Sequence, residues 1–492
     1  MERKISFKNL YLVGVISLGL IGLGIGSTFA MFTASAEIND SISMTSGLEY
    51  TDDVVDLVDM SISSNEVETA TLNITNNTDK TLNYTSWYKT NDSNLQIGTV
   101  VSNDYSVTGT IEPNQSAQII VSIRNRGTGV AKVTVGISAS DGDIVVSDGI
   151  TTLPSNPLPP YLNDYITSLY TSNKDDGTVT NNSIEYKYAS SVNLMNDRLG
   201  GTTEDLDGGN IRYYGASPNN YIDIGDRDSN DIAVLYRIVG VFDNKVKVVR
   251  NESIGNYSWD TSSSDVNEGK GINEWSQADL MKHLNPGYNN NKDKDNEGNT
   301  ITVNNSLWWN GGNGICYNAS NNASTTCDST NIGLSNNAKA IISSTKWYID
   351  GWTTTNVYPN QAYIAEKSNN VIENPVDNIA RTTVWFGKIG LISGSDYGYS
   401  TDLALCSELI RNYNNSNCLS NSWLSNNSEY IWTITSKYNA DSERLVYYIK
   451  SDGSYGAAAA ADNYSIKPTF YLIENTVLES GTGTSNDPFV VD

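Results

Sequence analysis

Two adjacent tryptophans are the first residues whose type and setting suggest a binding chemistry. Trp308 and Trp309 precede the glycine-rich run NGGNG at residues 310–314. An exposed indole ring stacks well on the C–H face of a sugar, so the pair is a candidate ligand platform. A tryptophan beside a glycine-rich turn is more often a core residue at the entrance to a loop. The sequence leaves both interpretations open.

The four cysteines predict disulfide bonds rather than a metal site. Cys316, Cys327, Cys406 and Cys418 allow three connectivities. We expect the local pairs Cys316–Cys327 and Cys406–Cys418, because each pair brackets a polar insertion rich in Asn and Ser. In an oxidising exterior, each short closed loop would stabilise the fold by about 3 kcal/mol. A four-cysteine zinc site needs short spacings such as Cys-x-x-Cys, which the sequence lacks.

Other catalytic or metal-binding signals are weak. His283 is the only histidine, which excludes sites built from several histidines. Residues 293–298 (DKDNEG) place oxygens at positions 1, 3 and 5 of a calcium loop and glycine at position 6, but position 12 is Asn304 instead of glutamate. No two carboxylates are marked as an acid–base pair. The sequence therefore predicts no catalytic residue, no cofactor-binding residue and no metal ligand, and leaves calcium dependence open.

The charge of the chain excludes one class of partner. The formal charge is −25 and the isoelectric point is about 4.3, with no cluster of Lys and Arg. Nucleic-acid binding needs such a cluster, and anionic lipid headgroups would repel this surface. The chain has 30 Tyr and 10 Trp against 7 Phe. Such aromatic residues suit half-buried sheets and exposed contact surfaces.

Residues 1–36 predict export. Arg3, Lys4 and Lys8 precede an uncharged apolar run at 10–30, and Ala-Ser-Ala at 34–36 is typical of a cleavage site. The run is also long enough for an uncleaved signal-anchor, so the protein would be either secreted or anchored in the membrane by this segment alone. In both cases the remainder lies outside the cytoplasm. Residues 26–36 (GSTFAMFTASA) resemble the signal region of camelysin and of biofilm-matrix-fibre (TasA-like) proteins.

Residues 37–152 predict an all-β domain. β-branched or aromatic runs at 67–74, 81–87, 118–123 and 130–137 alternate with turn clusters. Short strands at near-regular spacing are typical of an immunoglobulin-like sandwich. The order of these segments also resembles Ig-like stalk modules of bacterial surface proteins, which implies a spacer. The proline-rich run at 153–160 (LPSNPLPP) predicts a stiff linker.

Residues 161–492 predict an α+β domain. Residues 161–170 carry the apolar stripe of a short amphipathic helix, and 231–242 with 245–250 predict a hairpin turning at Asp243-Asn244. We expect further helices at 276–284, 337–349 and 402–413, and strands at 428–435, 443–450 and 465–473. Ser276 with Asp279 is the expected capping box of the first of these helices, and Thr401 is the expected cap of the third.

This domain resembles DUF6273-like proteins, a set of uncharacterised bacterial surface proteins. The resemblance spans residues 161–492 and rests on seven segments in order: 211–221, 235–242, 387–392, 395–399, 432–434, 467–472 and 481–489. It implies no activity and no functional residue. The order of a helix, a loop, WTI at 432–434, a hairpin and KPTFYL at 467–472 also resembles the C-type-lectin-like fold shared with formylglycine-generating enzymes.

The second resemblance implies an alternative role for two cysteines. Formylglycine-generating enzymes use a reactive cysteine pair, so Cys406 and Cys418 could play that part. The Arg-Gly-Gly-Ser-Trp context of that family is missing here, which favours structural disulfides.

Together these patterns predict an exported cell-surface protein with two domains. The first is an Ig-like stalk, and the second is a lectin-like recognition domain for adhesion to an extracellular glycan or glycoprotein. The alternatives are an extracellular enzyme on a formylglycine-generating-enzyme-like fold and a fibre or pilus-like structural subunit. The sequence does not identify the ligand or the oligomeric state.

Overall fold

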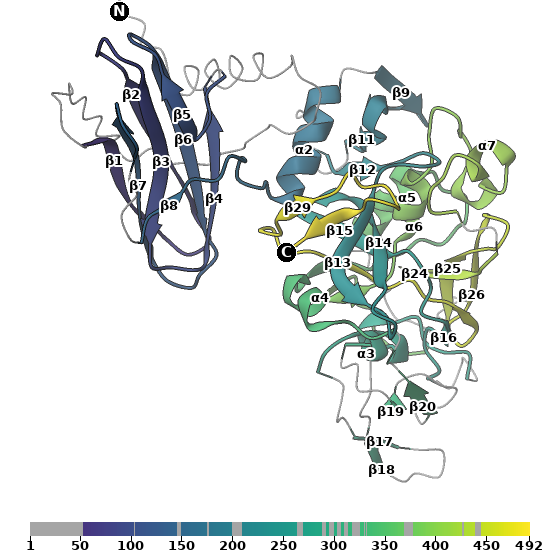
Figure 1. Ribbon diagram of the computed structural model, residues 1–492. Helices are drawn as coiled ribbons and strands as arrows, with labels where there is room; N and C mark the ends of the chain where they lie inside the picture. Colours follow the sequence, from purple (N-terminus) through teal and green to yellow (C-terminus); the bar gives the residue numbers. More distant parts are fainter. Residues whose placement is uncertain are drawn as a thin grey trace, which may run out of the picture. The chain divides into compact units, whose positions relative to one another are not determined.

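The structure is a computed structural model and covers most of the chain after residue 52 (Figure 1). It describes residues 53–492 except 103, 145–148, 175–176, 199–208, 263–268, 288–291, 295–299, 303–306, 309–312, 317–324, 329, 331, 369–376, 426–427 and 438–443. The chain divides between Pro160 and Tyr161 into two compact units. The expected signal segment, residues 1–36, lies outside the described residues. Within the described ranges, no helix combines the length and apolar character needed to cross a membrane.

The first unit is built from two antiparallel sheets. One has the order β1-β7-β3-β5 with β8 paired to β3, and the other has the order β2-β6-β4. Along β2, Ala70, Leu72 and Ile74 are buried between exposed neighbours, and they join one core with residues of both sheets such as Val121 and Val135. The all-β expectation for this unit is thus confirmed in its described part. The strands are β1 Asp53–Ile62, β2 Val67–Thr75, β3 Leu82–Thr90, β4 Leu95–Val101, β5 Thr108–Ile111, β6 Ser116–Asn125, β7 Ala131–Ser140 and β8 Thr151–Thr152.

The proline-rich segment 153–160 packs on this sandwich and is not a free linker. Leu153 and Leu158 are buried, and the Thr99 amide donates a hydrogen bond to the Asn156 carbonyl over 2.8 Å. Gly98 makes the close approach possible, because a Cβ there would lie 1.8 Å from the Leu158 nitrogen. Among the described strands β4 pairs with β6 alone, so the segment covers an edge strand, where prolines are tolerated. Residues 153–160 therefore belong to the first compact unit, and the boundary between the units follows Pro160.

The second unit is β-rich, and a large sheet forms its centre. The order is β23-β28-β15-β14-β12-β11-β10-β9; β13 pairs with β14 and β30, and β29 pairs with β30. The strands are β9 Gly177–Asn181, β10 Ile184–Ala189, β11 Leu194–Asn196, β12 Ile211–Tyr213, β13 Tyr221–Arg227, β14 Ala233–Phe242, β15 Lys245–Arg250, β23 Ile389–Gly390, β28 Thr469–Tyr471, β29 Leu478–Ser480 and β30 Phe489–Val491. Segments more than 200 residues apart in sequence therefore meet in one sheet.

Smaller sheets complete the described part of this unit. One has the order β16-β27-β24-β25-β26, and three others are two-stranded. Their strands are β16 Asn256–Ser258, β24 Ile431–Ser436, β25 Leu445–Ile449, β26 Tyr455–Ala459 and β27 Asn463–Ser465, with the pairs β17 Lys292–Lys294 and β18 Thr300–Thr302, β19 Asn313–Cys316 and β20 Thr325–Asp328, and β21 Thr345–Tyr348 and β22 Val384–Gly387. The expected strands at 428–435 and 443–450 are confirmed as β24 and β25. The expected strand at 465–473 is confirmed only for its central residues, as β28.

The hairpin β14–β15 forms where the sequence predicts it. Asp243 and Asn244 have φ angles of 47° and 61°, in the left-handed region that a tight two-residue hairpin turn requires. Asn and Asp tolerate this region better than other non-glycine residues. The turn places Phe242 and Lys245 side by side, and both line the site described below.

The helices are short, and three of the predicted ones differ from the structure. Helix 161–170 is confirmed as α2. The segment 276–284 is divided between a 3₁₀ turn (Trp275–Gln277) and helix α3 (Asp279–Leu284). In the segment 337–349 the helix α4 (Asn336–Ile341) ends at Ile341. The segment 402–413 contains one 3₁₀ turn. The helices are α2 Leu162–Asn173, α3 Asp279–Leu284, α4 Asn336–Ile341, α5 Pro359–Lys367, α6 Gly394–Tyr399 and α7 Ser416–Leu419, and the 3₁₀ turns are η2 Ser190–Val192, η3 Trp275–Gln277 and η4 Ile410–Asn412.

Each difference has a local or tertiary cause. The carboxylate of Asp279 accepts from the amide and hydroxyl of Thr261, so it forms no capping box with Ser276. Residues 345–348 pair as β21 with β22, and Trp347 lies opposite Trp385. Asp402 accepts from the amide of Ala404 two residues on, a turn that competes with a helix start.

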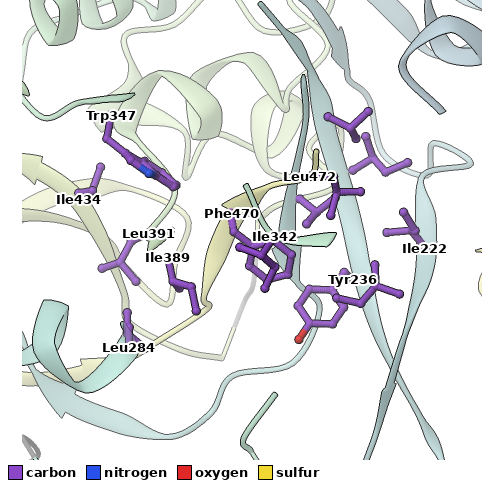
Figure 2. Close-up of a cluster of buried hydrophobic side chains, with 14 of the residues drawn as sticks. Ile222, Tyr236, Leu284, Ile342, Trp347, Ile389, Leu391, Ile434, Phe470 and Leu472 are labelled. Atoms are coloured by element: carbon purple, nitrogen blue, oxygen red, sulfur yellow. The ribbon is translucent and has the colours of Figure 1, made fainter. Parts of the chain in front are cut away.

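The core of the second unit draws on distant segments. Figure 2 shows part of it, with Ile222 of β13 and Tyr236 of β14 at one side and Trp347 of β21 and Ile434 of β24 at the other. Phe470 of β28 lies between, and its ring packs edge-on against Tyr236 at 5.2 Å between ring centres. Trp347 and Ile434 both approach Gly390, where a Cβ would lie 2.8 Å and 3.0 Å from them. The tight packing fixes the backbone on which the site is built.

Candidate functional site

Five ionisable side chains are buried together in the second unit. They are Asp197, Arg212 of β12, Lys247 of β15, Glu366 of α5 and Asp396 of α6, and each residue is at most 4% exposed. Lys, Glu, Arg and Asp are almost never fully buried unless they are paired. A cluster of this kind at a pocket is a typical mark of a functional site, although structural ion-pair networks also occur.

Asp396 connects the two buried cations. Its Oδ2 lies 2.5 Å from Lys247 Nζ, and its Oδ1 lies 3.0 Å from Arg212 Nη1. Arg212 Nε also contacts Asp197 Oδ2 at 2.6 Å. Burial alone would raise the pKa of Asp396, but Lys247 and Arg212 together lower the pKa below its usual value. Asp396 is therefore ionised and holds both cations in fixed positions.

Glu366 lies beside this network in a different state. It accepts hydrogen bonds from the Ser395 amide at 3.0 Å, the Ser395 hydroxyl at 2.5 Å and the Thr435 hydroxyl at 3.2 Å. Burial raises the pKa of Glu366 to about 7, and the charge of Asp396 acts in the same direction. Hydrogen bonds from Ser395 and the charge of Lys247 oppose the rise. Near neutral pH both the protonated and the ionised form of this carboxyl group are therefore populated.

A short helix start explains why Ser393, Ser395 and Asp396 converge here. Ser393 is the N-terminal cap of α6 and accepts from the Asp396 amide, while Asp396 Oδ2 accepts from the Ser393 amide at 2.9 Å. This reciprocal arrangement is a capping box, with Asp in place of the usual Glu. Helices α5 and α6 lie against each other (Figure 1), which brings Glu366 to Ser395. The pattern Ser-x-x-Asp at 393–396 is visible in the sequence, but its reading as a helix start was missed.

A small pocket opens over the network. Its volume is about 70 Å³, and Arg212, Lys247, Glu366, Ser395 and Asp396 line it. The other lining residues are the aromatic side chains Phe242, Trp347, Tyr348, Tyr363 and Tyr471, the charged side chains Asp243, Lys245, Lys346 and Lys367, and Asn210, Thr345, Ser393 and Ile434. Trp347 and Ile434 also close one side of the core in Figure 2, so the pocket wall is continuous with packed structure.

Two lysines that line the pocket lie over aromatic rings, and both contact the ring of Tyr348. Lys346 Nζ lies 4.6 Å and Lys367 Nζ lies 5.0 Å from the centre of the Tyr348 ring. Lys367 Nζ is also 4.5 Å from the centre of the Tyr363 ring. These distances are within the range of a cation–π contact. Strand β21 supplies Lys346 and Tyr348, and α5 supplies Tyr363 and Lys367, so two elements hold the group together.

A second hollow is larger but offers less chemistry. Its volume is about 480 Å³, and residues around Asp228–Leu235 and Arg250–Glu252 line it without any aromatic side chain. Its one lining cation, Arg250, donates to the Ile332 carbonyl at 2.9 Å. The candidate site is therefore the smaller pocket over Arg212, Lys247, Glu366 and Asp396, which has both charged and aromatic side chains in its lining.

The residues singled out in the sequence lie elsewhere. Trp308 is half-buried against the core, with Lys388 Nζ 5.0 Å from its ring centre, and Trp309 lies outside the described residues. His283 is buried, its ring stacks on Tyr257, and burial lowers its pKa to about 4. The segment 293–298 is described only at residues 293 and 294. Within the described ranges, no three His, Cys, Asp or Glu side chains are placed to hold a metal ion.

One of the two predicted disulfides is confirmed. Cys406 and Cys418 are bonded, with 4.8 Å between their Cα atoms, and both are buried. Cys316 and Cys327 lie on the paired strands β19 and β20, where Gly314 is opposite Cys327. Their side chains lie outside the described residues, so this second pair stays a prediction.

Comparison with known proteins gives no relative for this chain. No family model matches the sequence, and neither a curated protein nor a solved structure matches it.

Proposed function

We propose that the protein is an exported cell-surface recognition protein and that the pocket of its second unit binds the end of an extracellular glycan. The observation that carries the proposal is the combination of aromatic rings with rigidly held polar groups in one small pocket. Aromatic faces suit the C–H surfaces of a sugar ring, and hydroxyl, amide and charged groups suit its polar substituents. The first unit would serve as the stalk.

Rigidity supports binding without large rearrangement. Asp396 fixes Lys247 and Arg212, and Glu366 is held by Ser395 and Thr435. Polar groups that are already in place when the ligand arrives lose little freedom on binding. The desolvation that such buried charges cost is consistent with a role in function.

The size of the pocket limits what can enter it. A pocket that encloses a drug-sized ligand has a volume of roughly 300–1,000 Å³. The volume of about 70 Å³ here admits one substituent of a sugar and leaves the ring on the rim. Tyr348 lines the pocket and is only half-buried, so part of this residue is accessible to a ligand. A terminal sugar of a longer glycan fits these limits.

The test uses Tyr348→Ala with the purified protein on a glycan array. We expect wild-type protein to bind a defined set of glycans and Tyr348→Ala to lose most of that signal. Tyr430→Ala is the control, because Tyr430 is a tyrosine of the second unit that is exposed and does not line the pocket. Absence of glycan binding, or equal binding by both variants, would contradict the proposal.

Acid–base catalysis is the second candidate, and one contact favours it. The Ser395 hydroxyl donates to Glu366, whose pKa is raised to about 7 by burial, so a carboxylate near its pKa faces a potential nucleophile. Glu366→Gln separates the two functions. Recognition predicts glycan binding by this variant and no turnover by the wild type, whereas catalysis predicts turnover that the variant loses.

A further inference from the structure

The lining of the pocket has the opposite charge balance to the chain. The whole sequence has 31 Lys and Arg against 56 Asp and Glu. Among the described residues that line the pocket, five are cations (Arg212, Lys245, Lys247, Lys346 and Lys367) and three are acids (Asp243, Glu366 and Asp396). A cationic site on a protein that repels anions elsewhere concentrates the electrostatic attraction for an anionic ligand in one place.

The inner cations already have carboxylate partners, but two outer ones do not. Lys247 and Arg212 pair with Asp396, and Lys245 Nζ lies 2.6 Å from the exposed Glu474. Lys346 and Lys367 form no ion pair within the described part of the chain. Both stand over the ring of Tyr348, so two positive charges share one aromatic ring without a counter-ion. An anion bound at this side of the pocket would supply the counter-charge that both lysines lack.

Arg212 supplies a second and independent sign of a missing acceptor. Its Nη2 is buried and has no hydrogen-bond partner among the described residues, although Nε and Nη1 are both paired. The guanidinium lies 4.6 Å from the ring centres of Phe242 and Tyr399, and these rings accept no conventional hydrogen bond. A buried donor without a partner is costly, so native structures rarely keep one. Arg212 lines the pocket, so this buried side chain lies next to the space in which the ligand is proposed to bind.

We infer that the ligand of this pocket is an acidic sugar whose anionic group, a carboxylate or a sulfate ester, binds between Lys346 and Lys367. This inference rests on the proposed glycan binding and narrows it to one chemical class. Both groups are oxyanions that accept charge-assisted hydrogen bonds from ammonium and guanidinium groups. The volume of about 70 Å³ is suited to such a group, while the sugar ring stays against Tyr348.

The experiment compares matched glycans on one array and in titration with the purified protein. The probes are uronic-acid and sialylated glycans, sulfated glycans, and the neutral counterpart of each. We expect at least one acidic glycan to bind roughly tenfold tighter than its neutral counterpart, because one charge-assisted contact has about that effect. The class of acidic glycan that binds, carboxylated or sulfated, shows whether the anionic group is a carboxylate or a sulfate ester. Added salt should weaken the binding of the acidic glycan more than the binding of the neutral one, because salt screens charge interactions.

Variants that remove a positive charge test whether Lys346 and Lys367 cause the preference for acidic glycans. Lys346→Gln and Lys367→Gln should each reduce the preference for the acidic glycan, and the double variant should abolish it. Lys450→Gln removes the same charge from a residue outside the pocket and should change nothing. Lys346 is exposed and Lys367 is half-buried, so these variants are expected to fold, which tryptophan fluorescence can verify.

Two outcomes would overturn the inference. Equal affinity for acidic and neutral glycans, lost in Tyr348→Ala but unchanged in the lysine variants, would leave glycan recognition intact and exclude the anionic group. Binding of inorganic sulfate alone, with no glycan bound, would show that the lysines attract anions without recognising a sugar, and the proposed function would fail with the inference.

Discussion

Lys247 and Asp396 are 149 residues apart in sequence, yet Lys247 Nζ lies 2.5 Å from Asp396 Oδ2 and both side chains are buried. The contact joins the central sheet to the N-terminal end of α6, because Lys247 belongs to β15. It also fixes one wall of the pocket. The stability of the fold and the shape of the pocket therefore depend on the same pair.

Replacing Asp396 should destabilise the second unit strongly. In Asp396→Asn, Lys247 loses its only ion-pair partner in the described part of the chain, and Arg212 loses one of two. Breaking a buried pair by removing one partner costs about 3–5 kcal/mol. Urea unfolding followed by tryptophan fluorescence measures this, because of the ten tryptophans only Trp87 precedes Tyr161. Asp462→Asn, at an exposed position, is the control, and equal unfolding free energies would contradict the prediction.

Glu366 should make stability decrease between about pH 4.5 and pH 7. Burial raises the pKa of Glu366 from 4.5 to about 7, so over this range the folded protein binds a proton that the unfolded chain has released. Raising the pH then favours unfolding. This loss of stability is complete above about pH 7 and absent below about pH 4.5.

Glu366→Gln tests this pH dependence. The difference in unfolding free energy between wild type and variant should change by up to about 3 kcal/mol across that range, and Glu252→Gln, at an exposed position, should show no such change. A difference that is constant with pH would show that Glu366 titrates normally in the folded protein.

The disulfide Cys406–Cys418 should contribute more than a surface crosslink would. It closes a loop with a sequence separation of 12, and both cysteines pack in a core cluster with Ile410 and Tyr413. Closing a loop of this length stabilises by about 3 kcal/mol in the chain-entropy model. We expect Cys406→Ser with Cys418→Ser to lose at least about that amount in urea unfolding.

Peptide mapping under non-reducing conditions checks the pairing itself. It should give one fragment that links Cys406 to Cys418, and a second that links Cys316 to Cys327 if the local pairing holds throughout. A crossed pair would contradict both assignments. The double variant Cys316→Ser with Cys327→Ser is the control for the loss of a thiol pair elsewhere in the unit.

Gly98→Ala should release the proline-rich segment from the first unit. The new Cβ would lie 1.8 Å from the backbone nitrogen of Leu158, so the segment has to move. The Thr99 amide, which donates to Asn156, should then exchange its hydrogen faster, as hydrogen-exchange mass spectrometry can measure. Gly129→Ala is the control, because nothing lies within 4 Å of its Cβ position. Unchanged exchange at Thr99 would mean that the segment is not held by this contact.

Local patterns in the sequence predicted the elements that local physics decides. The Asp243-Asn244 turn forms because these two residues tolerate positive φ, and the apolar spacing after Tyr161 gives α2. The Cys406–Cys418 pair is close in sequence and closes a short loop. Strand-like runs separated by turn clusters were enough to predict the all-β first unit. They did not predict where segment 153–160 packs, because that packing depends on the close approach of Gly98 to Leu158.

Elements whose form depends on distant partners were missed. Residues 345–348 became a strand because Trp347 meets Trp385 across β21 and β22, and no local pattern contains that partner. Tyr348 follows Trp347 directly in the sequence, but the second lysine over its ring, Lys367, comes from α5, so no local pattern shows that contact.

The sequence by itself determined the acidic composition, the all-β character of the first unit, the strong hairpin and one disulfide, since each follows from composition or from residues near one another. Only the tertiary structure decided the pocket. Arg212, Lys247, Glu366 and Asp396 are single charges scattered over nearly 200 residues, and no spacing rule connects them. They become a site because packing of β12, β15, α5 and α6 removes water from all four at once, and charges without water must find each other or a ligand.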